Sequence, residues 1–240
     1  MTDTGNLAPG PDRTAALEQY RQRAGVYDLE LALFEPLRRQ AISRLGLQHG
    51  DCVLDIGCGT GLSLALLRQA VGIKGRIIGI EQCPEMIEHA RERVERQQLG
   101  KVTLLRAPVE SAALHGKADA ALFHFTHDIL IRPDAVANVV RHLRPGARVV
   151  ACGLKWAGIW VMPVNFFVWG AAMRSVTSMR GLQQPWMDLA KRVADLRVET
   201  MWASSIYIAS GQIADPIRSP RSPKKRTKHC GQVLDSSGGS

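Results

Sequence analysis

A glycine-rich turn after an apolar run is the feature that most constrains the fold of this chain. Residues 53–61 read V-L-D-I-G-C-G-T-G, so the apolar run contains an acid and three glycines then alternate with other residues. Glycine has no Cβ and tolerates positive φ, so such a turn lets the backbone approach a ligand closely. The turn therefore predicts a binding site at the end of a strand.

Strand and helix patterns alternate along the chain. We expect strands at residues 52–56, 76–80, 102–105, 118–123, 148–154, 197–203 and 205–209. Helices are expected within residues 14–45, after residue 61, from Pro84 and from near Pro133, and Pro36 is expected in the first turn of a new helix. This alternation predicts βαβ units, an α/β fold and a mainly parallel sheet, in which ligands bind at the carboxyl ends of the strands.

Length and composition predict one domain with flexible ends. The 240 residues suffice for a full core, with a flexible leader at 1–12, a single domain at 13–211 and a disordered basic tail at 212–240. Within the domain, we expect a helical cap at 13–46 and a lid-like apolar insertion at 155–185. The chain opens without a secretory pattern and its five cysteines form no CxxC, which predicts reduced thiols, no metal site and a cytoplasmic protein.

Part of the net charge of +9 lies at the end of the chain. Residues 212–240 hold six basic side chains against two acidic ones. Such a tail can touch nucleic acid or anionic lipid, but a solvated tail without a specific partner is the favoured interpretation.

The spacing of the glycines excludes two common phosphate-binding turns. A P-loop requires a lysine after its last glycine, and none follows Gly61. The dinucleotide fingerprint G-x-G-x-x-G places its third glycine at Leu62 or Leu64, depending on the register.

The pattern Asp55-x-Gly57-x-Gly59-x-Gly61 resembles the class I S-adenosylmethionine-dependent methyltransferases, especially the branch that acts on quinones and phospholipids. The resemblance implies a Rossmann-like seven-stranded, mainly parallel sheet with helices on both faces and a helical N-terminal cap. It also implies that Asp55 and the turn, including Cys58, hold the methionyl end of S-adenosylmethionine.

A second acid supports an adenosine-containing cofactor. Glu81 ends the second expected strand, where a carboxylate can accept both ribose hydroxyls, although this position also fits NAD. By resemblance, Gln82 contacts the cofactor and Met86 covers the adenine. The pattern is equally consistent with Met86 as part of the ordinary helix core.

The adenine segment departs from the family pattern. The family usually carries a glycine, an acid and a small residue after the third strand, whereas this chain has Ala107-Pro108-Val109-Glu110. Pro108 stands in place of the acid and offers neither a carboxylate nor an N–H. By resemblance, the Val109 amide is then expected to bind the adenine ring, and the Glu110 carboxylate is expected to reach the adenine amino group.

The end of the fourth strand is expected to face the methyl group. His124 and Phe125 are expected beside the cofactor, and His127 is the best candidate for a base or acceptor contact, since histidine titrates near neutrality. Structural roles, with His124 packing at the strand end and Asp128 capping a helix, remain an alternative.

An uncharged, apolar stretch at residues 156–173 indicates a hydrophobic acceptor. It contains three tryptophans, with Pro163 and Asn165 near its middle, which argues against a membrane span. It can form a lid over an apolar acceptor pocket, a patch that docks on a membrane or partner chain, or ordinary core.

Together these features predict an S-adenosylmethionine-dependent methyltransferase that acts on a small, hydrophobic acceptor. Nucleic acid is a disfavoured acceptor, because no Asn/Asp-Pro-Pro-aromatic tetrad is present. Two alternatives remain: an NAD-dependent oxidoreductase, and a non-catalytic protein that binds S-adenosylmethionine or another partner.

Overall fold

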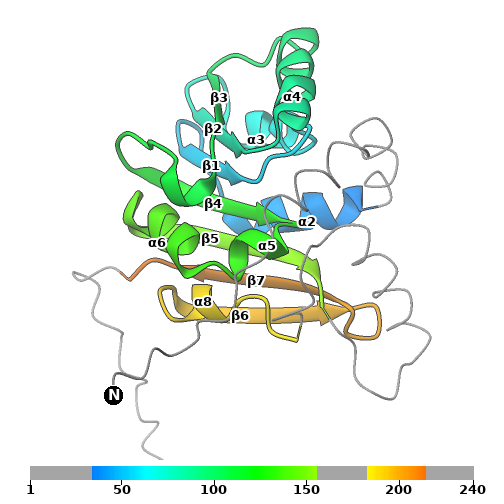
Figure 1. Ribbon diagram of the computed structural model, residues 1–240, viewed down its shortest axis with the longest axis vertical. Coiled ribbons are helices and arrows are strands. Elements are labelled where there is room, and N and C mark those ends of the chain that lie inside the picture. The colour runs from blue at the N-terminus through cyan, green and yellow to red at the C-terminus, as the bar shows by residue number, and fades with distance from the viewer. Residues whose placement is uncertain (1–33, 156–182, 215–240) are drawn as a thin grey trace, which may run out of the picture.

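The described residues, 34–155 and 183–214 of a computed structural model, contain a seven-stranded sheet with the strand order β3-β2-β1-β4-β5-β7-β6 (Figure 1). Strands β1 to β5 pair in parallel, and β7 runs antiparallel to both β5 and β6. This is the predicted Rossmann-like sheet, with one antiparallel hairpin at its edge. The strands are β1 (Cys52–Ile56), β2 (Arg76–Glu81), β3 (Val102–Arg106), β4 (Ala118–His124), β5 (Leu143–Leu154), β6 (Ala194–Met201) and β7 (Ile206–Gln212).

Helices cover both faces of the sheet, as predicted. One apolar core joins α2 (Glu35–Leu45) and α3 (Leu64–Val71) to the sheet, together with Ala90 of α4 (Pro84–Arg96). The opposite face is covered by α6 (Pro133–Arg141) and α8 (Met187–Ala190), and the short helices η1 (Val109–Ser111) and α5 (His127–Leu130) lie in the loops after β3 and β4. Helix α2 begins with a proline in its first turn, as predicted.

Residue alternation along the strands explains the two cores. On β4, Ala121 and Phe123 enter the core under α6, whereas Ala120 and Leu122 enter the core under α2. Because successive side chains of a strand point to opposite faces, the next residue, His124, lies on the α2 face of the sheet. The order of the strands reverses between β1 and β4, which creates a crevice at their carboxyl ends.

Several predicted boundaries are wrong at the antiparallel edge. Strand β5 begins at Leu143 rather than at residue 148, and β6 and β7 span residues 194–201 and 206–212 rather than 197–203 and 205–209. The sheet also extends past the predicted domain end at residue 211, because Ile213 donates to Ala147 and accepts from Gly146, both at 2.9 Å.

Several predictions concern segments outside the described residues. These are the leader at 1–12, most of the cap at 13–46, nearly all of the apolar insertion at 155–185 and the tail from residue 215 onward. Among the helices within the described ranges, none has the length and apolar character needed to cross a bilayer.

Candidate functional site

The glycine-rich turn connects β1 to α3 and is bonded to the neighbouring strand. Gly57, Gly59 and Gly61 have φ values of 63°, 56° and 80°, a region that favours glycine. The Cys58 N–H donates to the Ile80 carbonyl of β2 at 3.0 Å. This hydrogen bond ties the turn at the end of β1 to the neighbouring strand β2.

Gly57 has a further structural role. A Cβ at this position would lie 2.6 Å from Cγ2 of Thr126 and 2.8 Å from Cδ1 of Ile129. The segment after β4 therefore packs directly on the turn, and any larger residue would clash with it.

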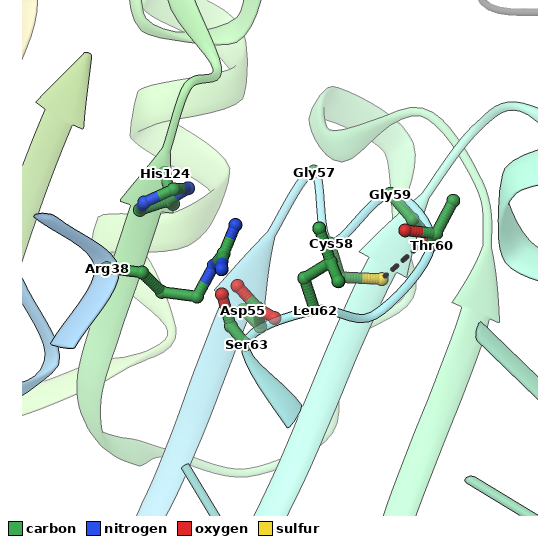
Figure 2. Close-up of a pocket in the computed structure, with 9 residues that line it drawn as sticks. All are labelled: Arg38, Asp55, Gly57, Cys58, Gly59, Thr60, Leu62, Ser63 and His124. Carbon is green, nitrogen blue, oxygen red and sulfur yellow. Dashed lines mark hydrogen bonds between the residues drawn. The ribbon is translucent and has the colours of Figure 1, made fainter. Parts of the chain in front are cut away.

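A pocket lies beside this turn (Figure 2). Its lining residues come from α2, β1, the turn and the end of β4, and they are Arg38, Asp55, Gly57, Cys58, Gly59, Thr60, Leu62, Ser63 and His124. Five of them belong to the predicted site: Asp55, Gly57, Cys58, Gly59 and His124. Figure 2 shows the Arg38 guanidinium between the Asp55 carboxylate and the His124 ring.

Arg38 is a site residue that the sequence analysis missed. It is only 1% exposed, and its Nη1 donates to Glu35 one turn earlier in α2. Its Nε and Nη2 are buried and have no hydrogen-bond partner among the described residues. The available signal was its position with Ala41, Ile42 and Leu45 on the apolar face of an amphipathic helix, where an arginine is rarely buried without a partner.

Asp55 supplies the opposite charge. It is 2% exposed, and its Oδ2 has no hydrogen-bond partner within the described part of the chain. Burial raises the pKa of Asp55 to about 7, and the negative charge of Glu81 adds to this effect, while the Arg38 charge opposes it. The cofactor-free site therefore holds a carboxyl group that is partly protonated at neutral pH.

His124 completes the polar lining. Its Nε2 is buried, without a partner among the residues described, and its ring packs against Phe125 at a centroid distance of 4.9 Å. Burial lowers the pKa of His124 to about 3, and the Arg38 charge lowers it further, so the imidazole is neutral at physiological pH.

These three side chains match the two charges of an α-amino acid. Unpartnered guanidinium N–H groups can bind a carboxylate, and a carboxylate oxygen beside them can accept from an ammonium group. Buried polar groups without partners are rare in proteins and call for an explanation. The methionyl end of S-adenosylmethionine carries both charges, so the residues present fit this cofactor.

Glu81 lies at the end of β2, as predicted, but it is not among the residues that line the pocket. Its Oε2 accepts from the Gly59 N–H at 3.1 Å and its Oε1 accepts from the Cys83 N–H at 2.8 Å. Burial raises the pKa of Glu81, and these backbone N–H groups oppose the rise. The carboxylate thus ties the glycine-rich turn to the start of α4, and its remaining lone pairs are available to ribose hydroxyls.

The predicted adenine segment follows β3, outside the pocket lining. Val109 is 5% exposed, and its carbonyl accepts from the side chain of Asn138 in α6 at 2.6 Å. The Glu110 carboxylate forms an ion pair with Arg132 at 2.9 Å, and Pro108 precedes the η1 turn. The structure therefore holds this segment against α6.

Three other predicted cofactor residues, Met86, Gln82 and Gly61, are not among the residues that line the pocket. Met86 is 2% exposed in α4, which agrees with a core role as well as with adenine contact, and Gln82 joins β2 to α4. Gly61 is not among the lining residues, although Thr60 and Leu62 on either side of it are.

His127 and Phe125 also lie outside the residues that line the pocket. His127 is 6% exposed and begins α5, and Phe125 packs against Phe34 with ring centroids 4.8 Å apart. The catalytic role of His127 therefore stays a prediction.

Comparison with known proteins agrees with the geometry. Residues 53–146 match a family described as a methyltransferase domain. The aklanonic acid methyltransferase DauC of Streptomyces sp. strain C5 is 29% identical over 126 residues, which cover 52% of this chain and 57% of DauC. The ubiquinone/menaquinone biosynthesis C-methyltransferase UbiE of Geobacter sp. strain M21 is 31% identical over 125 residues, which cover 51% of this chain and 53% of UbiE.

A solved structure shows a similar fold. A SAM-dependent methyltransferase from Aquifex aeolicus aligns over 82% of this chain and 98% of its own, with a TM-score of 0.58 and 21% identity. The chain spans about half the length of the curated relatives it matches. The glycine-rich turn, the sheet order, the match of residues 53–146 to a methyltransferase domain and these relatives support a class I S-adenosylmethionine-dependent methyltransferase.

Proposed function

We propose that this protein transfers a methyl group from S-adenosylmethionine to a small, hydrophobic acceptor. The observation that carries the proposal is the set of buried, unpartnered polar atoms on Arg38, Asp55 and His124 beside the glycine-rich turn. In this assignment, Arg38 binds the methionyl carboxylate and Asp55 accepts from the methionyl ammonium group. When bound, the cofactor supplies an electrophilic methyl group on a positively charged sulfur.

The other predicted residues are assigned to the nucleoside half of the cofactor. Glu81 would accept from the ribose hydroxyls while it holds the Gly59 N–H. The segment that contains Val109 and Glu110 would face the adenine, and Asn138 would keep that segment in place. The protein contributes mainly by positioning, because a sulfonium is already a reactive methyl donor.

The small, hydrophobic acceptor is supported by the names of two relatives, DauC and UbiE, and by the apolar stretch in the sequence. Other relatives are named as a protein-L-isoaspartate O-methyltransferase and a 23S rRNA uracil methyltransferase. An acceptor panel should therefore contain a polycyclic aromatic ketide, a quinol, an isoaspartyl peptide and an RNA hairpin, with release of S-adenosylhomocysteine as the signal.

Cofactor binding is the first experiment. Calorimetric titration of the full chain with S-adenosylmethionine, S-adenosylhomocysteine and NAD should show binding of the two adenosyl compounds only. Arg38→Gln should weaken S-adenosylhomocysteine binding at least tenfold, since a hydrogen bond to a charged group contributes roughly 1.5–3 kcal/mol. Arg39→Gln is the matched control, because Arg39 also pairs with Glu35 but its side chain is 62% exposed.

The alternatives predict other results. Binding of NAD alone would favour an oxidoreductase, and binding of the adenosyl compounds without turnover on any acceptor would favour a non-catalytic binding protein. An Arg38→Gln variant that is folded and binds like the wild type would refute the placement of the methionyl end.

A further inference from the structure

Positive charge gathers at the edge of the sheet opposite the pocket. The segments that lead into or begin strands β1 to β6 are residues 46–51, 72–76, 97–101, 113–119, 141–148 and 190–195. They carry three aspartates and nine exposed cations, which we call the amino-end face: Lys74, Arg76, Lys101, Lys117, Arg141, Arg144, Arg148, Lys191 and Arg192. The other described residues hold eleven lysines and arginines against twelve acids, so the net positive charge of the described chain lies on this face.

Strand pairing places these cations in a row. Arg76 pairs with the first residue of β1, and Lys101 immediately precedes β3, which pairs with β2. Arg148 of β5 pairs with Ala120 near the start of β4, and Arg192 shortly precedes β6. The seven strands are spaced about 4.8 Å apart, so the row extends over about 29 Å.

Most of these charges have no acidic partner. Arg144 forms an ion pair with Asp119, and Lys191 forms one with Asp188 at 2.7 Å. The other seven cations of the amino-end face form no ion pair among the described residues. Their charge is therefore available to a partner of opposite sign.

The basic tail of the sequence is attached at the same face. Because β7 runs antiparallel to β5, its last residue, Gln212, pairs with Arg148. Figure 1 shows this end of β7 on the side where β4 and β5 begin. Residues 215–240 follow in the sequence and hold six basic side chains against two acidic ones. Two separate sets of cations thus start from one end of the molecule.

The arrangement of the amino-end face favours a linear polyanion over a lipid surface. Contact with a membrane combines cations with apolar side chains that insert among the lipids. Ile73, which is 87% exposed, is the one large apolar side chain that is exposed in the segments of this face. Nucleic acid instead offers a row of phosphates, which lysines and arginines bind without reading the sequence.

We propose that the amino-end face binds the phosphate backbone of a nucleic acid, as a docking partner and not as the methyl acceptor. The pocket lies at the carboxyl ends of the strands, and the five residues of β1 separate it from this face by about 17 Å. A nucleic acid on the amino-end face therefore leaves the cofactor pocket open. The inference goes beyond the proposed function and does not depend on which acceptor is methylated.

The test is fluorescence anisotropy of the full chain with a labelled single-stranded RNA of roughly 20 nucleotides and a DNA duplex of roughly 20 base pairs, between about 50 and 200 mM salt. We expect one or both to bind, with an affinity that falls as salt rises. The triple variant Lys74→Gln/Lys101→Gln/Arg148→Gln removes cations that belong to β2, β3 and β5. Each lost phosphate contact lowers the slope of log affinity against log salt by about 0.7 to 0.9, so the slope should fall by about 2 to 3 and the affinity near 0.1 M salt at least tenfold.

The matched control makes the same change in net charge elsewhere. Arg39→Gln/Arg91→Gln/Arg96→Gln removes three exposed arginines from α2 and α4, and it should bind nucleic acid within threefold of the wild type. Both variants should bind S-adenosylhomocysteine within twofold of the wild type, with or without nucleic acid, which also shows that they are folded. Failure of the wild type to bind S-adenosylhomocysteine would refute the proposed function and not this inference.

Four results would overturn the inference. The first is no binding of either nucleic acid, and the second is an equal loss in the two variants, which would show that only net charge matters. The third is a face variant that binds like the wild type, which would assign binding to the tail alone. The fourth is binding to vesicles of phosphatidylcholine and phosphatidylserine, lost in the face variant, without binding of nucleic acid, which would make the face a lipid contact.

Discussion

Asp55→Asn should stabilise the cofactor-free protein while it impairs cofactor binding. Asparagine has nearly the same shape as aspartate but carries no charge, and Asp55 is 2% exposed. Burial raises the pKa of Asp55 because the surroundings disfavour the ionised form, even with Arg38 nearby. Above neutral pH, the wild-type protein therefore folds with a carboxylate in an unfavourable position, and the variant does not.

The magnitude follows from the pKa. A rise from 3.8 to about 7 corresponds to about 4 kcal/mol, because a tenfold change in proton affinity is about 1.4 kcal/mol. The folded state binds this proton more tightly than the unfolded state, so the free energy of unfolding falls as pH rises from about 4 to about 7. The advantage of Asp55→Asn should be small near pH 4, grow through this interval and reach its full size above pH 7.

Urea denaturation of the cofactor-free proteins between pH 4.5 and pH 8.5 measures this difference. The control is Asp51→Asn, which removes the charge of a half-buried carboxylate next to the start of the same strand. A difference between Asp55→Asn and the wild type that does not change with pH would refute the reasoning, because it would mean that Asp55 has the same proton affinity in the folded and unfolded states. A variant less stable than the wild type at pH 8 would do so as well.

Three further predictions concern the same site. Binding of S-adenosylhomocysteine at pH 7 should release about half a proton, because the ammonium group of the ligand favours the ionised form of Asp55. Calorimetry in two buffers of different ionisation enthalpy measures this release, and a release of zero would contradict the contact between Asp55 and the ammonium group. Gly57→Ala should destabilise the protein by roughly 2–4 kcal/mol in urea denaturation, because its Cβ would lie 2.6 Å from Thr126 and its φ is 63°. Gly116→Ala is the control: it has a φ of 80° but nothing within 4 Å of its Cβ, so it should cost only about 1–2 kcal/mol. Asn138→Leu should lower the free energy of unfolding by about 2–4 kcal/mol, because the Val109 and Ala112 carbonyls lose their donor. The same variant should weaken adenosine binding in calorimetry, and an unchanged affinity would show that the segment held by Asn138 does not bind the adenine.

The sheet and the glycine-rich turn could be predicted from the sequence because their signals are local. Apolar residues with the period of a strand, and glycines at the strand end, report backbone conformation within a few residues. The predictions of β1 at Cys52–Ile56 and of a proline in the first turn of α4 are confirmed for this reason. The bounds of β6 and β7 were wrong because an antiparallel register is set by the partner strand, which periodicity does not report.

The polar content of the pocket was decided only by the tertiary structure. Arg38 precedes Asp55 by 17 positions and reaches the pocket only because the apolar face of α2 packs on the sheet. Likewise, Glu81 bonds to the glycine-rich turn and Thr126 packs on Gly57 through the pairing of β1 with β2 and β4. The sequence by itself determined the conformation of the glycine-rich turn, since that depends on residues within the turn. Which side chains line the pocket beside the turn depends on how separate elements pack, and only the fold sets that.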